Sequence, residues 1–214
     1  MSLIVSAKGS GGLPPVSEGN HVGICIGLYD IGVHYNERFE KSSPKVVISW
    51  ELPEEIASGA PRIVNKTYTA SLSEKSALRQ DLESWRGRAF TTEELEAFYL
   101  ANILGKPCML QIIHNTKGEN TYANIKAVTS LHKSIPVPPP VNEPKSFDLD
   151  DSNWLWQLDH GELPEWVVKR VKESETYQER MEQGAGTRKA EEEAEADAVE
   201  LGELVARPED DQPF

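Results

Sequence analysis

Hydrophobic residues alternate with small or polar ones along five stretches of the chain, with the period of two that is typical of β-strands. These stretches span residues 21–29, 45–52, 62–70, 108–114 and 121–131. We expect the first strand to be half-buried, with Gly23 and Gly27 on a flat face that suits a bulge, a bend or close approach of a ligand backbone. Trp50 lies on the apolar side of the second strand, which favours a core position over a base-stacking role.

A period near 3.6 interrupts this alternation between the third and fourth stretches. Ser73 is expected to cap a helix that ends near Gly87, and a second helix is expected over residues 93–104. Near the C-terminus, Pro164 begins a predicted helix whose apolar stripe docks onto the sheet or a second subunit. The pattern predicts a mainly β fold, a five-stranded Greek-key barrel of the oligonucleotide-binding (OB) type with a helical insert, a C-terminal helix and a disordered acidic tail.

Composition divides the chain into five segments. Glycine and proline dominate the start, prolines follow the last predicted strand, and alanine and glutamate dominate the end. We therefore predict a flexible leader, an OB-like core, a Pro-rich linker, a Trp-containing acidic segment with a docking helix, and an acidic tail, at residues 1–19, 20–134, 135–145, 146–183 and 184–214.

The net charge of −13 by itself argues against a nucleic-acid partner, but this charge is unevenly distributed along the chain. Residues 20–135 carry 13 Lys and Arg against 13 Asp and Glu, whereas residues 136–214 carry 8 against 21. The excess of acid therefore belongs to the C-terminal third. A neutral core can still bind phosphate through one basic face.

Basic and aromatic residues share faces of the predicted strands. The third strand places Arg62, Lys66 and Tyr68 on one side, and the fifth places Tyr122 and Lys126 outward. Cations that hold phosphates beside rings that stack on bases are typical of single-strand binding, although an ordinary solvated face explains the same pattern. The predicted DNA contacts are Tyr29, Arg62, Lys66, Tyr68, Arg86, Arg88, Tyr122 and Lys126, with Lys45 and Lys117 at the rim.

An acidic run precedes the last five residues, Asp210-Asp211-Gln212-Pro213-Phe214. This tip resembles the C-terminal tip of bacterial single-stranded DNA-binding proteins, and residues 70–79 and 103–108 are similar to phage-encoded members of that group. The resemblance implies an OB-fold protein that binds single-stranded DNA without sequence specificity during phage DNA replication, recombination or repair. It also implies that Asp210, Asp211, Pro213 and Phe214 recruit replication proteins of host or phage. The alternative is a disordered tail that ends in phenylalanine by chance.

Other functional classes find little support in the sequence. The histidines lack metal-ligand spacing, no phosphate-binding glycine loop or nucleophile triad is present, and Cys25 and Cys108 are expected to be buried in apolar strands. We predict no enzyme, no cofactor and no metal site. No apolar run is long enough to span a membrane, so we expect a cytoplasmic protein, in the infected bacterial host if phage-encoded. A non-DNA-binding adaptor or DNA mimic stays open as the alternative function, as does a homo-oligomer.

Overall fold

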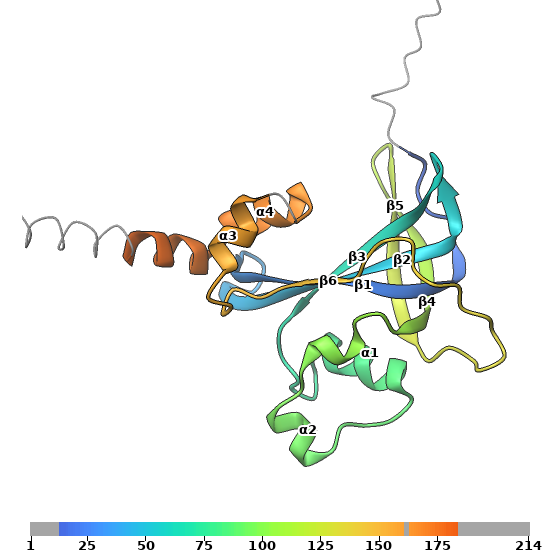
Figure 1. The fold of residues 1–214 in the computed structure, drawn as a ribbon, viewed down its shortest axis with the longest axis horizontal. Helices are drawn as coiled ribbons and strands as arrows, with labels where there is room; N and C mark the ends of the chain where they lie inside the picture. Colours follow the sequence, from blue (N-terminus) through green and yellow to red (C-terminus); the bar gives the residue numbers. More distant parts are fainter. Residues whose placement is uncertain (1–12, 161–162, 184–214) are drawn as a thin grey trace, which may run out of the picture.

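The computed structural model describes residues 13–160 and 163–183. Most of its regular structure is an antiparallel sheet, to which helices add an insert and a C-terminal segment (Figure 1). In chain order the elements are β1 (Gly19–Asn36), β2 (Lys41–Ala57), β3 (Ala60–Thr69), α1 (Ala77–Arg86), α2 (Thr92–Glu96), the 3-10 helix η1 (Leu100–Ile103), β4 (Pro107–Lys117), β5 (Asn120–Thr129), β6 (Lys145–Phe147), α3 (Trp154–Asp159) and α4 (Glu165–Lys172). The mainly β architecture predicted from the alternation is confirmed.

β1 is the central strand of the sheet. It pairs with β2 on one side and β4 on the other, which gives the order β3-β2-β1-β4-β5, and the short β6 runs parallel to β1. The helical insert follows β3, as predicted, and lies against one side of the coiled sheet, whereas α3 and α4 lie at the far end of the β1–β2 hairpin (Figure 1). The hydrogen-bonded path is open, because its end strands β3 and β5 approach each other without forming a ladder.

Both faces of β1 are covered, whereas alternation predicted a half-buried strand. Cys25 and Leu28 pack into the main core, and Tyr29 and Ile31 pack into a second cluster with the C-terminal helices. A bulge follows Cys25. Of the bulge, the bend and the close ligand approach that the glycine-rich face suggested, the bulge is confirmed. The second face is filled by segments more than a hundred residues away in sequence, which local alternation cannot reveal.

Trp50 and the two cysteines lie in the core, as predicted. All three side chains are fully buried, and both thiols are free. Burial raises the pKa of Cys25 to about 12 and that of Cys108 well above its usual value, because a thiolate would lose its hydration. The two cysteines therefore act as small apolar side chains.

The helical insert differs from its prediction at both ends. α1 begins at Ala77 rather than after Ser73, because residues 71–76 form a turn in which the Ser76 hydroxyl donates to the Ser71 carbonyl. Gly87 ends α1 in the left-handed conformation with φ 68°, as expected for a helix C-terminus.

The predicted second helix over residues 93–104 is divided into α2 and η1. Thr91 and Glu94 form a capping box that begins α2, and the backbone becomes extended at Ala97. Phe98 then packs edge-on against Phe90, with ring centroids 5.0 Å apart. A tertiary contact between aromatic rings, rather than local helix propensity, decides where this helix ends.

The C-terminal segment folds back onto the sheet. The buried Glu51 carboxylate of β2 accepts hydrogen bonds from the backbone N–H groups of Val141 and Asn142, each at 2.8 Å. Val167 and Val171 of α4 are fully buried in the second cluster. The expected docking of this helix therefore occurs on the chain's own sheet.

The predicted continuous helix from Pro164 to about residue 183 is interrupted. α4 ends at Lys172, and residues 175–183 form a further helical segment. Between them lies the buried Ser174, whose hydroxyl donates to the Val171 carbonyl and accepts from the Tyr177 N–H. Ser174 fits against Gly32 of β1, where an added Cβ would lie only 2.6 Å from the serine oxygen.

Candidate nucleic-acid interface

The predicted binding face of β3 points inward, which corrects the sequence interpretation. Tyr68 is 3 % exposed, and its hydroxyl donates to Asp81 of α1 at 2.7 Å. Lys66 binds the same carboxylate at 2.6 Å. Burial, then the nearby Asp81 charge, raises the pKa of Tyr68, so its hydroxyl stays protonated and keeps donating. Lys66 and Tyr68 anchor α1 to β3, and the exposed face carries Ile63, Asn65, Thr67 and Thr69 instead.

Tyr29 is also unsuited to stacking on a base. The side chain is 5 % exposed, and its ring meets Trp166 edge-on with centroids 5.9 Å apart. Strand alternation put Tyr29 on an open face because the sequence does not show that the C-terminal helices cover that face. The prediction of an open ring at Tyr29 is wrong for this structure.

The arginines predicted to contact DNA bind other groups of the protein instead. Arg62 donates to the Pro14 carbonyl at 2.8 Å. Arg86 and Arg88 both bind Glu94, and these hydrogen bonds, Arg86 first, lower the pKa of that carboxyl to about 2. Their positive charge is therefore partly neutralised at this site.

Tyr122 and Lys126 face outward on β5, where the sequence placed them. Tyr122 is 51 % exposed, and Lys126 is exposed as well. The inward partners on this strand, Ala123 and Ile125, pack against the main core, as predicted. Among the predicted DNA contacts, Tyr122 and Lys126 place an aromatic ring and a basic side chain on the same open strand face.

A basic cleft that sequence analysis did not identify lies between the β1–β2 hairpin, β3, the β3–α1 loop and α4. Its volume is about 710 Å³. The charged side chains that line it are Lys41, Lys45, Lys75 and Arg170, and no carboxylate is among the lining residues. Hydroxyl groups surround these cations, from Thr67, Thr69, Ser71, Ser73 and Ser76. Ammonium, guanidinium and hydroxyl donors in one cleft are suited to binding phosphate oxygens.

An exposed aromatic ring lines the basic cleft, and a second one lies in the adjoining β1–β2 loop. Tyr35 lines it and is 57 % exposed, and Phe39 in the β1–β2 loop is 70 % exposed, with Arg38 stacked 5.5 Å from its ring centroid. Exposed rings beside cations provide a surface on which bases of any identity stack. The cleft therefore offers both kinds of contact that the sequence analysis assigned to β3.

Electrostatics inside the basic cleft are positive. The Lys45 ammonium donates to Thr69 Oγ1 at 2.8 Å, and both residues line the cleft. Burial lowers the pKa of His34. The charges of Arg170 and Lys45 add to this effect, whereas the hydrogen bond to the Ile31 carbonyl and the charge of Glu173 oppose it. The three lysines and one arginine that line the cleft favour an anion there.

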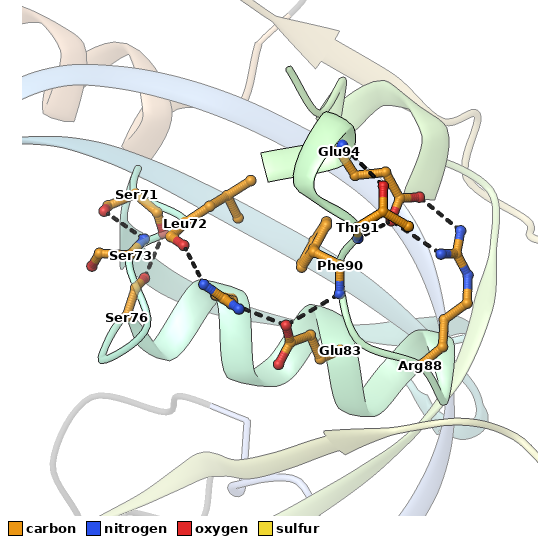
Figure 2. Close-up of polar contacts among 10 residues, drawn as sticks. Ser71, Leu72, Ser73, Ser76, Glu83, Arg88, Phe90, Thr91 and Glu94 are labelled. Carbon is orange, nitrogen blue, oxygen red and sulfur yellow. Dashed lines mark hydrogen bonds and ion pairs between the residues drawn. The ribbon is translucent and has the colours of Figure 1, made fainter. Parts of the chain in front are cut away.

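Hydrogen bonds fix the loop of residues 71–76, as Figure 2 shows. Three serines of this loop line the basic cleft. The Ser71 hydroxyl accepts the Ser73 N–H at 3.2 Å, and Arg79 donates to the Leu72 carbonyl. Arg79 also binds Glu83, which in turn accepts the Phe90 N–H at the other end of α1. This network ties both ends of α1 to their loops and holds the serines in place before any ligand arrives.

Only part of the cleft carries a signal in the sequence. Lys41 and Lys45 follow the β1–β2 turn, and hairpin loops beside a binding face commonly contribute to ligand binding in folds of this kind. Arg170 reaches the cleft only because α4 docks on β1, about 130 residues earlier in the chain. The predicted tail residues Asp210, Asp211, Pro213 and Phe214 lie outside the described residues.

Within residues 13–160 and 163–183, no three His, Cys, Asp or Glu side chains lie close enough together to hold a metal ion. In the same part of the chain, no helix is long and apolar enough to cross a membrane. The chain matches no protein-family model, and it matches no curated protein at a significant level.

Proposed function

We propose that the protein binds single-stranded DNA without sequence specificity, through the basic cleft, in DNA replication, recombination or repair. The observation that carries the proposal is the lining of the cleft, which holds Lys41, Lys45, Lys75 and Arg170 and no carboxylate. Backbone phosphates supply the same charge at every position of a strand, so cations alone give affinity without specificity. The resemblance of the acidic C-terminal tip to that of single-stranded DNA-binding proteins supports the same function.

Binding uses two kinds of contact. The lysines, Arg170 and the surrounding hydroxyls hold the phosphates, and Tyr35 and Phe39 stack on unpaired bases. A duplex keeps its bases stacked on each other, so it gains only the phosphate contacts. Tyr122 and Lys126 extend the surface if the strand continues across β5.

Fluorescence anisotropy of a labelled oligo-dT, beside a duplex of equal length, tests this proposal. We expect the single strand to bind more tightly than the duplex and its affinity to fall linearly in log salt, with a slope of about 0.7 per phosphate contact. Absence of single-strand binding at low salt would contradict the proposal and favour the adaptor or DNA-mimic alternative.

Residues 207–214 form the second part of the proposed function. Their acidic side chains compete with DNA phosphates for the basic cleft, and when DNA displaces them they bind replication proteins. Deletion of these residues should tighten oligo-dT binding severalfold at low salt and abolish binding to those proteins, measured by anisotropy and by pull-down. Unchanged behaviour in both measurements would contradict this role.

A further inference from the structure

A second cavity, with a volume of about 590 Å³, opens at the C-terminal end of α1. Trp85 and Arg86 line it, whereas Ala77 at the start of the same helix lines the basic cleft. Because α1 has 10 residues, the two ends lie about 15 Å apart. The second cavity is therefore a separate site, bounded by α1, η1 and residues 130–137.

The floor of the second cavity is apolar and mostly aliphatic. Ile103, Leu131, Ile135 and Val137 contribute to it. Two of the lining rings are covered, since Trp85 is 7 % exposed and Arg86 lies over Phe98 with 5.2 Å to the ring centroid. Among the lining rings only His132 is exposed, so a base would find a single small ring to stack on, whereas an aliphatic or aromatic side chain of a partner would fit the aliphatic lining.

The rim of the second cavity is basic. Arg86, Arg88, Lys106 and Lys133 line it, against one carboxylate, that of Glu94. Arg88 binds both oxygens of Glu94, at 3.0 and 2.7 Å, which is the paired geometry that guanidinium groups form with carboxylates. Among the described residues, the side chains of Lys106 and Lys133 make no hydrogen bond or ion pair, and Arg86 has a buried side-chain nitrogen without a partner.

We propose that the second cavity binds an acidic peptide segment of a partner protein. An apolar side chain of the peptide contacts the aliphatic lining, and the carboxylates of the peptide pair with Lys106 and Lys133. Charge complementarity and the mostly aliphatic lining favour this partner over nucleic acid, because the phosphates of a strand would find cations here but its bases would find only the small ring of His132 to stack on. The site leaves the basic cleft open, so one molecule holds a partner protein and a DNA strand at the same time.

A fluorescein-labelled peptide of 12 residues, in which Leu and Phe alternate with Asp and Glu, tests the site with the full-length protein. Anisotropy should show saturable binding at low salt. The matched peptides, with Ser in place of Leu and Phe or with Asn and Gln in place of the acids, should bind at least about tenfold more weakly.

Variants of exposed residues locate the peptide. Lys106→Glu with Lys133→Glu, and separately Val137→Asp, should each weaken peptide binding about tenfold or more. The matched control carries Lys41→Glu, Lys75→Glu and Arg170→Glu in the basic cleft and should bind the peptide as the unaltered protein does. Far-UV circular dichroism and thermal melting establish that each variant is folded.

Three outcomes would overturn the proposal. The first is no saturable peptide binding by the unaltered protein, and the second is equal loss of peptide binding in the cleft control. The third is a loss of oligo-dT binding in the Lys106→Glu, Lys133→Glu variant without any loss of peptide binding, which would assign the cavity to nucleic acid. Peptide binding by a protein that fails to bind oligo-dT would contradict the proposed function and leave this site intact.

Discussion

Reversal of three charges in the basic cleft should strongly weaken oligo-dT binding. Lys41, Lys75 and Arg170 are exposed, and their side chains make no hydrogen bond or ion pair with the described residues. Lys41→Glu, Lys75→Glu and Arg170→Glu therefore remove no side-chain contact that holds the fold. We expect a loss of about a hundredfold in affinity at low salt, because each change removes an attraction to phosphate and adds a repulsion. The slope of log affinity against log salt should fall by about 2.

The control for this variant carries the same charge change elsewhere. Lys106→Glu, Lys133→Glu and Lys169→Glu alter the net charge identically at exposed positions outside the basic cleft. This protein should lose only the small, non-local part of the attraction, and anisotropy with oligo-dT across a salt series compares the two. Equal losses in both variants would show that net charge, rather than the cleft, determines DNA binding.

Gly32→Ala should destabilise the protein by about 3 kcal/mol, which combines a strained backbone with an overfilled contact. Gly32 has φ +78°, which an alanine adopts at a cost, and its added Cβ would lie 2.6 Å from Ser174 Oγ. The second effect acts where the C-terminal helices dock on β1. We therefore also expect weaker oligo-dT binding, because Arg170 enters the cleft from α4.

Gly59→Ala separates the two effects. Gly59 has φ +83° but nothing within 4 Å of an added Cβ, so the change measures backbone strain alone, about 1 kcal/mol. Chemical unfolding of both variants gives the difference. Ser174→Gly in the Gly32→Ala background should restore part of the stability, and a double-mutant cycle without coupling would contradict the close contact.

The two proposed binding sites lie at opposite ends of α1 and use different chemistry. The basic cleft combines cations, hydroxyls and exposed rings, whereas the second cavity combines cations with an aliphatic floor. The hydrogen bonds along α1 in Figure 2 connect the loops at both sites. A protein of this design is suited to bring a partner to a single strand, which agrees with the proposed role in DNA metabolism.

Local pattern was sufficient to predict strands β1 to β5, the helical insert after β3 and the burial of Trp50, Cys25 and Cys108, whereas β6 was not predicted. Alternation of apolar residues reports a strand wherever one face meets a core, and this holds before the strands are assembled. It also assigned the outward position of Tyr122 and Lys126 on β5 correctly, because their neighbours Ala123 and Ile125 are small or apolar.

The sequence pattern failed where a distant segment decided which face is open. On β3, the face that carries Lys66 and Tyr68 points inward, because Asp81 of α1 accepts hydrogen bonds from both side chains. On β1, the C-terminal helices cover Tyr29. The basic cleft likewise exists only after α4 brings Arg170 beside the β1–β2 hairpin. Burial of a face depends on which long-range segment packs on it, and period-two alternation contains no information about that partner.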